Sequence, residues 1–378
     1  MSADRTLVIW RSHLLAGSET FVRNHGAALT RWRPVYLGAV KVDSAVAADS
    51  DVIVYPDTAL DRGALLQLKL TGSGSRLRDR LAALRPAVVH AHFGNDGWLV
   101  SRSAAQLGVP LVVTLHGYDV TRLPGEPGWR GARYRRNLRQ MFERASVILA
   151  VSGFIRDRAV ALGADPAKIR VHHTGVPIPP PPAPTEKRWD LLFVGRFVAK
   201  KGIDDLVEAV GRLDVPRPRV LFVGTGPLEQ PVRERAAALG LDATFLGAQD
   251  PAEVRRHMTE SKVFVSPSKT APNGESEGLP TTILEAASLG VPAVSTYHSG
   301  IPEAVRHDET GLLGAEGDRA ALTANIRRLL TDDDLRSRLG EQARHHVATH
   351  FDLATQSARL EELYDALRAG VTPTSDPR

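Results

Sequence analysis

Short apolar runs alternate along the chain with polar stretches that are compatible with helices. In the first half, the apolar runs occupy residues 6–10, 51–55, 86–92, 110–116 and 146–152. In the second half, they occupy residues 190–195, 219–224, 243–247, 262–267 and 292–296. Short apolar strands that alternate with helical connections indicate parallel sheets with crossover helices. The pattern therefore predicts two Rossmann-like α/β domains.

A proline-rich segment separates the two series of strands. Residues 176–187 read VPIPPPPAPTEK, and proline removes backbone donors and favours a stiff, extended connector. We therefore expect a first domain over residues 1–175, a linker over 176–187 and a second domain over 188–352. A helical pattern from about residue 353 to 370 is long enough to cross back onto the first domain, and the residues beyond it are expected to fray.

Composition narrows the classes of function. The 378 residues are 43% hydrophobic and 24% charged, with no cysteine, as in a conventional globular protein without disulfides or thiolate chemistry. No apolar stretch has the ~20 residues that a membrane span needs, and a cytoplasmic location is expected. The net charge of +5 indicates anionic partners. Zinc-finger spacing and aromatic-interleaved basic stretches are missing, so no nucleic-acid partner is expected.

One basic helical segment bears on whether the protein contacts a membrane at its surface. Residues 130–145 place Tyr134, Leu138, Met141, Phe142 and Ala145 on one helical face, with several arginines elsewhere. Such a face commonly packs on its own sheet while the arginines stay solvated. The alternative is a peripheral contact with an anionic membrane, at its inner face.

The residues that follow each apolar run are the most informative for chemistry, because ligands of open α/β sheets bind beyond the carboxyl ends of the strands. In VGRFVAKKGIDDLVEAV, a strand ends at Gly195 and a helix begins near Ile203. Cations at a helix N-terminus oppose the helix dipole, unless an anion lies between them and the backbone donors. Arg196 and Lys201 are therefore candidate ligands of a diphosphate, and a solvated basic loop is the alternative.

A second informative loop reads NGESEGLPTTILEAASLG, with Pro280 at the expected helix start. Glu277 stands beside the amides of Gly278 and Leu279, which we expect to bind phosphate. Glu285 lies within the helix among apolar residues, where a carboxylate needs hydrogen-bond donors, and a ribose diol supplies two. The alternative for Glu277 is an ordinary acid stabilised by the helix dipole.

Two further sites lie in the first half. His116 follows a strand in TLHGYD, and Gly17 and Ser18 precede the first helix in LLAGSETFVRNH. Gly17 could offer its amide to the diphosphate, and Ser18 could equally cap the helix. His90 and His92 share a strand face with a spacing that could ligate metal together with His116. Since no carboxylate partner is evident nearby, we expect no metal.

Several of these motifs together carry a family resemblance. EGLPTTILE resembles the Glu, seven residues, Glu motif of retaining family-4 glycosyltransferases, and VGRFVAKKG resembles their phosphate loop. HAHFG, LHGYDV, AVSGFIRD and SGIPEAV are similar to the bacterial polysaccharide branch, so the likeness covers nearly the whole chain. The paired glycines of many relatives are absent at Gly17, which weakens that assignment.

The resemblance implies the GT-B fold, with an N-terminal acceptor domain, a C-terminal nucleotide-sugar domain and a cleft between them. It implies that His116 lies against the donor sugar, that Glu277 contacts sugar hydroxyls and that Glu285 holds the ribose. The expected activity is retaining transfer of a hexose or hexosamine without a cofactor, from UDP-sugars in preference to GDP-sugars. The acceptor would be a saccharide, a lipid-linked saccharide or a small aglycone. The alternatives are a related epimerase or phosphorylase, or a non-catalytic sugar-nucleotide binder.

Overall fold

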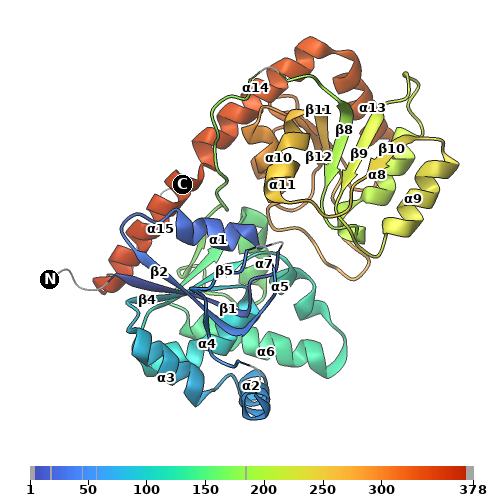
Figure 1. The fold of residues 1–378 in the computed structure, drawn as a ribbon. Coiled ribbons are helices and arrows are strands. Elements are labelled where there is room, and N and C mark those ends of the chain that lie inside the picture. Colours follow the sequence, from blue (N-terminus) through green and yellow to red (C-terminus); the bar gives the residue numbers. More distant parts are fainter. Residues whose placement is uncertain (1–4, 18, 45, 57, 184, 372–378) are drawn as a thin grey trace. The chain divides into compact units, whose positions relative to one another are not determined.

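The chain forms two compact units in the computed structural model, which describes residues 5–17, 19–44, 46–56, 58–183 and 185–371. Unit 1 contains the described residues up to Gly175 and those from Leu353 onward, and unit 2 contains Val176–Asp352. Each unit has a parallel sheet between helices (Figure 1). The expectation of two Rossmann-like α/β units is confirmed.

The described residues of unit 1 form a seven-stranded parallel sheet in the order β3-β2-β1-β4-β5-β6-β7. Its strands are β1 Thr6–Leu14, β2 Arg33–Lys41, β3 Val52–Ile53, β4 Val88–His92, β5 Leu111–Leu115, β6 Val147–Ala150 and β7 Ile169–Val171. The strand order reverses between β1 and β4, which pair through Leu7 and Val88. The carboxyl ends of these two strands therefore flank the switch point where ligands of such sheets bind.

Helices cover both faces of the unit 1 sheet. They are α1 Thr20–Ala27, α2 Ala59–Thr71, α3 Ser75–Leu84, α4 Gly94–Gln106, α5 Tyr118–Thr121, α6 Gly128–Arg144, α7 Gly153–Ala161 and α15 Leu353–Arg368, with a 3-10 turn η1 at Leu123–Gly125. Helices α1 and α15 pack together on one face, and α4 packs on the other, where α3 and α6 contact it (Figure 1). Leu360, Leu363 and Leu367 place α15 in the unit 1 core, so the expected return of the C-terminal helix is confirmed.

Unit 2 repeats the architecture with a six-stranded parallel sheet in the order β10-β9-β8-β11-β12-β13 among its described residues. The strands are β8 Trp189–Val194, β9 Arg219–Val223, β10 Asp242–Phe245, β11 Ser261–Ser266, β12 Ala293–Thr296 and β13 Gly311–Gly314. The helices are α8 Ile203–Val210, α9 Glu229–Ala238, α10 Pro251–Thr259, α11 Thr281–Ser288, α12 Ile301–Ala304, α13 Arg319–Thr331 and α14 Asp333–His350, with a 3-10 turn η2 at Ala199–Lys201. Helix α8 packs with α9 and α13, whereas α11 packs with α10 and α14.

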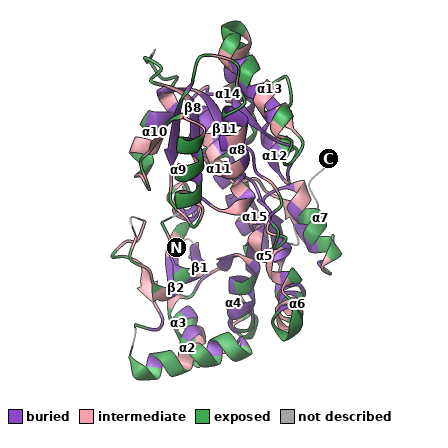
Figure 2. Ribbon diagram, turned by 90° about the vertical axis from the view of Figure 1, so that its right-hand side faces the viewer, coloured by how far each residue is buried: buried purple, intermediate pink, exposed green. Residues whose placement is uncertain are grey.

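The sheet residues are the most deeply buried in both units (Figure 2). Strands of parallel sheets with helices on both faces read as continuous apolar runs, which is why most strands could be found in the sequence. Strands β2, β7 and β13 lie outside the expected runs. Each of them carries glycine, proline or charged residues within a short apolar segment, which weakens the signal.

The apolar side of α6 packs inside unit 1. Leu138, Met141 and Phe142 are buried, and α6 contacts α4. This face is therefore covered by protein, so the alternative that it lies against a membrane is wrong. Within the described residues, no helix combines the length and apolar character needed to cross a bilayer.

Candidate functional site

The loop after β8 carries the basic residues expected to bind phosphate. The strand ends at Val194, and Arg196 and η2 follow before α8 begins at Ile203, as expected. Gly202 joins η2 to α8 with φ +62°, and a Cβ atom there would collide with the carbonyl oxygen of Pro267. Glycine is therefore required at this position, and the basic loop packs directly on the loop after β11.

Unit 2 brings these cations against the carboxylates of the loop before α11. Lys201 Nζ lies 3.2 Å from Glu277 Oε1, and Lys200 Nζ lies 3.6 Å from the same oxygen. Lys200 Nζ is 2.9 Å from Glu275 Oε1, and Arg196 Nη2 is 4.0 Å from that atom. The sequence-predicted residues Arg196, Lys201 and Glu277 thus lie in one cluster.

Glu277 has an unusual electrostatic position at the centre of this cluster. Burial raises the pKa of its carboxyl, but attraction by Lys201 and Lys200 outweighs that effect and brings the pKa to about 2. The side chain is therefore ionised at neutral pH. Its Oε1 is buried 3.2 Å from the Lys201 ammonium group, and hydrogen bonding to Lys201 contributes to the low pKa. A carboxylate oxygen can accept more than one hydrogen bond, so this oxygen can also bind a ligand hydroxyl.

Two residues of the cluster, Lys200 and His298, were given no role from the sequence. Lys200 is buried and bridges both glutamates, although only its neighbour Lys201 was expected to bind phosphate. His298, after β12, accepts a hydrogen bond from the Glu277 amide to Nε2 at 3.1 Å, and its Nδ1 lies 2.6 Å from Glu316. Nothing in the sequence around His298 indicates this role, because its partners lie far away along the chain.

The backbone of the acidic loop differs from the expectation in one respect. Helix α11 begins at Thr281, after Pro280. The amides of Gly278 and Leu279 therefore belong to the loop, and the helix-end donors are those of its own first turn. The carbonyl oxygen of Gly278 accepts a hydrogen bond from the Gly300 amide at 3.2 Å. The assignment of Gly278 and Leu279 to phosphate stays a prediction, without the support of a helix terminus.

Glu285 lies on α11, one turn beyond its start. Burial raises the pKa of its carboxyl, partly offset by attraction from Arg255. Within the described residues, the Glu285 carboxylate makes no hydrogen bond. The argument that this carboxylate needs donors from a ligand therefore stands, and its role at the ribose stays a prediction.

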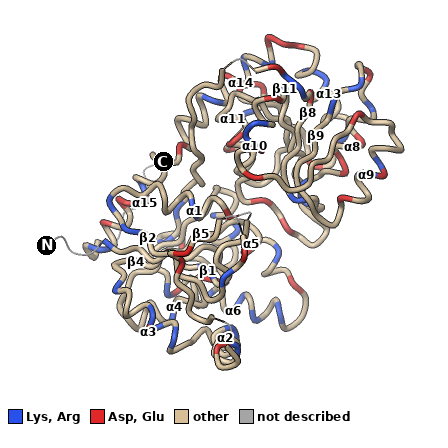
Figure 3. Tube along the Cα trace, in the orientation of Figure 1, with Lys and Arg blue, Asp and Glu red and all other residues tan. Residues whose placement is uncertain are grey.

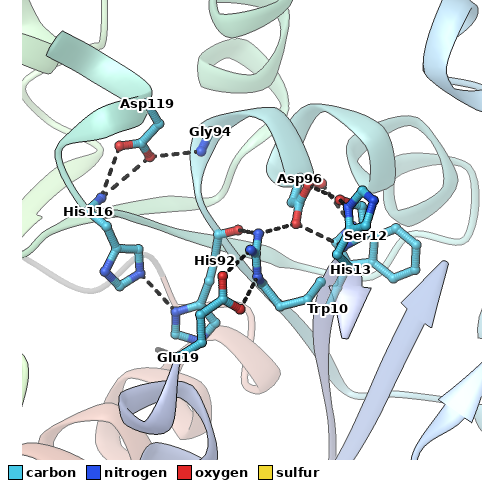
Figure 4. A network of polar contacts seen from close by, with 10 residues as sticks. Trp10, Ser12, His13, Glu19, His92, Gly94, Asp96, His116 and Asp119 are labelled. Atoms are coloured by element: carbon cyan, nitrogen blue, oxygen red, sulfur yellow. Dashed lines mark hydrogen bonds and ion pairs between the residues drawn. The ribbon is translucent and has the colours of Figure 1, made fainter. Parts of the chain in front are cut away.

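His116 directly follows β5 in unit 1, where Asp119 organises the turn (Figure 4). The Asp119 carboxylate accepts hydrogen bonds from the amides of Gly117 and Gly94 at 2.9 Å and of His116 at 3.1 Å. These bonds tie the turn after β5 to the start of α4. Asp119 thus fixes the backbone that presents His116.

The His116 ring packs against two aromatic side chains and a second histidine. Its centroid is 4.7 Å from Phe21 and 4.5 Å from Phe93. Its Nε2 lies 3.0 Å from Nδ1 of His92 (Figure 4). Burial lowers the pKa of His116 to about 3, helped by the Arg11 charge. The imidazole is therefore neutral at physiological pH and can donate or accept a hydrogen bond.

A buried ion network beside this histidine was not expected from the sequence. Arg11, in the second half of β1, pairs with Glu19 and with Asp96 of α4. Asp96 also accepts from the Ser12 amide at 2.8 Å (Figure 4). The Arg11 guanidinium lies 4.4 Å from the Phe93 ring centroid. The network joins the starts of α1 and α4 to the end of β1, next to the residues that pack on His116.

Gly17 lies exposed in the same β1–α1 connection, and a Cβ atom there would meet nothing within 4 Å. Its conformation does not require glycine, so its assignment to the diphosphate rests on the family resemblance alone and stays a prediction. Ser18 lies outside the described residues. Helix α1 begins after Glu19, which makes no side-chain cap.

Unit 1 also contains an open pocket with a cavity volume of about 40 Å³ at the carboxyl ends of its strands. It is lined by Phe21, His25, His90, His92, Thr114, His116, His172, His173, Thr174, Gly175, Leu353, Gln356, Ser357 and Leu360. Burial lowers the pKa of His25 to about 4 and of His172 to about 3. The pocket therefore combines hydrogen-bonding groups with apolar walls and lacks a lysine, arginine or carboxylate in its lining.

Three of the pocket histidines, His25, His90 and His92, have ring nitrogens within 4.8 Å of one another. Imidazole suits zinc, copper and nickel. However, His90 uses both nitrogens in hydrogen bonds, at 2.6 Å to the Tyr364 hydroxyl and 2.7 Å to that of Thr114. A metal ion would have to replace one of these bonds. The expectation of no metal stays a prediction.

Comparisons with known proteins agree across both units. Residues 15–178 match the model of Glycosyltransferase Family 4, and residues 178–346 match that of Glycosyl transferases group 1. A Salmonella typhimurium protein described as a colanic acid biosynthesis glycosyltransferase is 30% identical over 73% of this chain and 70% of its own length. A GDP-mannose-dependent phosphatidylinositol monomannoside mannosyltransferase of Mycobacterium tuberculosis is 28% identical over 90% of both chains.

The fold is also shared with a solved structure. The Anabaena protein HepE, in complex with UDP-glucose, superposes with a TM-score of 0.78 at 18% identity, over 96% of this chain and 99% of that one. At this identity the likeness concerns the fold, whereas the family matches concern descent. The chain therefore belongs to the family-4, group 1 glycosyltransferases, which are enzymes of the GT-B fold that use nucleotide sugars.

Proposed function

We propose that this chain is a retaining hexosyltransferase in polysaccharide or glycoside biosynthesis, which moves a hexose or hexosamine from a UDP-sugar to a hydroxyl of its acceptor. HepE binds UDP-glucose, and the Salmonella relative is described for colanic acid biosynthesis. The mycobacterial relative is GDP-mannose-dependent, so GDP-sugars are the competing donors. That relative acts on a lipid, which makes a lipid-linked saccharide an acceptor to test beside free saccharides and small aglycones.

The observation that carries this proposal is the buried Glu277 Oε1 between two ammonium groups. A buried carboxylate that two ammonium groups keep ionised can accept a further hydrogen bond from a donor-sugar hydroxyl, which supports this proposal. The lysines that neutralise it lie beside the same position. One small cluster thus offers an acceptor for the sugar and cations for the diphosphate, and a nucleotide sugar needs both.

The reaction places negative charge on the diphosphate as the anomeric bond breaks, so catalysis depends on stabilising that charge. Arg196 and Lys201 bind the phosphate oxygens, and Lys200 supplies a third positive charge from within the loop. Glu275 and Glu277 keep these cations positioned before the donor arrives. Glu285 holds the ribose.

The neutral pocket supports an uncharged, hydroxyl-bearing sugar as the part of the substrate that enters unit 1. Uncharged imidazoles and the hydroxyls of Thr174 and Ser357 can pair with sugar hydroxyls, and Phe21 offers an apolar face. An anionic group there would lose its hydration without a cation in the lining to replace it. His116 forms part of this wall, consistent with contact to the transferred sugar.

Thermal unfolding with a panel of UDP- and GDP-sugars tests the donor, because a ligand that binds the native state raises the melting temperature. We expect the largest increase with a UDP-sugar, and a smaller one in Lys201→Ala. Saccharide acceptors are then added to the best donor, and the anomeric configuration of the product is determined by NMR. Inversion would refute the retaining assignment, and stronger stabilisation by GDP-sugars would overturn the donor preference.

Omitting the acceptor separates the remaining activities. A transferase releases nucleoside diphosphate rapidly only when the acceptor is present, whereas an epimerase converts the donor alone. A phosphorylase needs inorganic phosphate, and a non-catalytic binder raises the melting temperature without turnover. Acceptor-dependent release that Glu277→Gln abolishes is the result expected here.

A further inference from the structure

The loop after β12 holds the backbone of Glu277 through three successive residues. His298 Nε2 accepts a hydrogen bond from the Glu277 amide at 3.1 Å, and the Ser299 hydroxyl donates to the Glu277 carbonyl oxygen. The Gly300 amide donates to the carbonyl oxygen of Gly278 at 3.2 Å. We call His298, Ser299 and Gly300 the clamp loop. This loop therefore fixes the peptide groups on both sides of the Glu277 side chain.

The partners of His298 determine where its proton lies. The Glu277 amide can only donate, so Nε2 must offer a free lone pair. Nδ1 lies 2.6 Å from Oε1 of Glu316, in the connection after β13. Burial raises the pKa of Glu316, but hydrogen bonds from the Thr270 amide and from His298 outweigh that effect and lower it. Glu316 is therefore an ionised acceptor, and His298 is the neutral tautomer with its proton on Nδ1.

Glu316 connects this histidine to the rest of unit 2. The charged residues of unit 2 lie mainly on helices and connecting loops, around strands that are largely uncharged (Figure 3). Glu316 also accepts from the Thr270 amide at 2.7 Å, so it joins the loops after β11, β12 and β13. His298 is 1% exposed among them. Because its bonds are buried, water does not replace a partner that is removed.

Ser299 gives the clamp loop a specific conformation. Its φ is +50°, in the left-handed region that residues other than glycine seldom occupy. Such residues persist where surrounding contacts determine the backbone, and they concentrate at functional sites. Here the contacts are the hydroxyl's bonds to the carbonyl oxygens of Glu277 and of Gly278, the latter at 3.4 Å. The unusual conformation is therefore tied to the backbone that carries Glu277.

We propose that His298 is a positioning residue of the sugar site, whose neutral imidazole fixes the Glu277 backbone so that the carboxylate meets a hydroxyl of the donor sugar. This inference rests on the proposed role of Glu277. The lysines that pair with the carboxylate stay in place when His298 is changed, because they belong to the loop after β8. Loss of the Nε2 bond should therefore weaken contacts to the sugar and spare those to the nucleoside diphosphate.

Two substitutions separate the two nitrogens of His298. An asparagine amide reaches the position of Nδ1 and keeps a donor for Glu316, whereas a glutamine oxygen reaches the position of Nε2 and accepts from the Glu277 amide. Calorimetric titration compares the nucleotide sugar that stabilises the chain most in the thermal panel with its free nucleoside diphosphate. We expect His298→Asn to weaken nucleotide-sugar binding about tenfold, as for one buried hydrogen bond, and nucleoside diphosphate binding less than about twofold. His298→Gln should restore most of the lost affinity.

Ser299→Gly tests the clamp loop in a variant that keeps its fold. Glycine adopts the left-handed conformation freely, so only the hydroxyl is lost, and nucleotide-sugar binding should again weaken selectively. His307→Gln is the matched control. His307 accepts the Leu313 amide through Nδ1 at 3.0 Å, so this variant also removes a histidine that binds a backbone amide, in the turn before β13. It should bind both ligands as the unchanged chain does.

Melting temperatures check the folding of each variant, and Ser299→Gly carries the test if His298→Asn does not fold. Unchanged nucleotide-sugar binding in the folded variants, or an equal loss of both ligands, would overturn the positioning role. Glu277→Gln separates this outcome from a failure of the proposed function. If Glu277→Gln loses nucleotide-sugar affinity and the clamp-loop variants do not, only the present inference fails. If Glu277→Gln itself binds the nucleotide sugar normally, the carboxylate does not contact the sugar and the proposed function fails.

Discussion

The lysines and glutamates of the unit 2 cluster form ion pairs that hold them in place before a ligand binds. Lys201 and Lys200 carry positive charge at the start of a helix, where the dipole opposes it, and Glu277 and Glu275 offset that cost. The lysines in turn keep the Glu277 carboxylate ionised, because their charge lowers its pKa to about 2. Glu277 is therefore negatively charged at neutral pH before a ligand arrives.

Replacing Lys201 by alanine removes one cation from this cluster. We expect kcat/KM for the nucleotide sugar to fall. The decrease should correspond to a loss of about 1.5–3 kcal/mol of transition-state stabilisation, the range for hydrogen bonds to charged groups. Steady-state kinetics measure this. Lys262→Ala is the control, because Lys262 pairs with Asp190 at the start of β11, away from the strand ends. Unchanged kcat/KM in Lys201→Ala would remove this lysine from the donor site.

Glu285→Ala tests the ribose assignment. The carboxylate makes no hydrogen bond within the described residues, so its removal should leave the melting temperature nearly unchanged. Contacts that exist before and during reaction affect ground-state binding, and we therefore expect a raised donor KM with a similar kcat. Glu341→Ala, on an exposed position of α14, serves as the control. Loss of folding in Glu285→Ala would instead indicate a structural glutamate.

The sequence predicted residues whose chemistry is local and missed those that depend on distant partners. Arg196, Lys201 and Glu277 follow strand ends or precede a helix, so their neighbourhood is visible in the sequence. Arg11 pairs with Asp96, 85 positions away, and His298 with Glu316, 18 positions away. No local pattern marks such pairs, because the fold alone brings them together.

At the scale of elements, strands that are buried on both faces could be predicted, and the partners of helices could not. The apolar side of α6 has the same periodicity whether it meets lipid or protein, and only packing against α4 decides the outcome. Helix α2 carries leucines on opposite sides, so its sequence does not show which side is covered. Amphipathicity predicts a buried face, and the tertiary structure determines what buries it.

The turn between η2 and α8 provides a test at this scale. Gly202 has φ +62°, and a Cβ atom would collide with backbone of the neighbouring loop. Gly202→Ala should therefore lower the free energy of unfolding by about 1–3 kcal/mol and weaken donor binding, because the loop that carries Lys201 must move. Denaturant unfolding and donor KM measure the two effects.

Gly63→Ala is the matched control for this substitution. Gly63 lies inside α2 and has open space around it, so alanine there should stabilise the helix by about 0.5–1 kcal/mol. If Gly202→Ala is as stable and as active as the unchanged chain, the basic loop is more adaptable than its packing indicates.

At the scale of the whole chain, the C-terminal helix completes a unit that the first half of the sequence begins. Tyr364 of α15 bonds His90 and His25 through its hydroxyl at 2.6 and 3.0 Å, and Glu361 accepts from the Thr30 amide at 2.7 Å. The length of this helix in the sequence predicted that it packs back onto the first domain. The sequence did not predict which residues it contacts there. The roles of unit 1 as acceptor domain and unit 2 as donor domain stay predictions.

The two units should differ in their response to acid. Burial lowers the pKa values of six histidines in unit 1, namely His13, His25, His90, His92, His116 and His172, and that of His257 in unit 2. Below about pH 6.5, the unfolded chain binds protons on them that the folded unit does not bind. The contribution of these imidazoles to the free energy of unfolding is therefore complete above that pH. It is lost as the pH falls toward the pKa values that the imidazoles have in the folded state. In unit 2, Glu277 contributes stability that is lost only as the pH falls from about 4.5 toward 2.

Unit 1 should consequently unfold first on acidification, with a loss of up to about 1.4 kcal/mol per pH unit for each histidine that stays neutral in the folded state. Thermal unfolding at pH 7.5, 6 and 5, followed by tryptophan fluorescence, measures the slope, because Trp10, Trp32 and Trp98 are buried in unit 1. His172→Gln should make the slope shallower, whereas His345→Gln, exposed on α14, should leave it unchanged. Since the mechanism is uptake of protons by the unfolded chain, a melting temperature that stays constant from pH 7.5 to 5 would show that these imidazoles titrate normally in the folded unit.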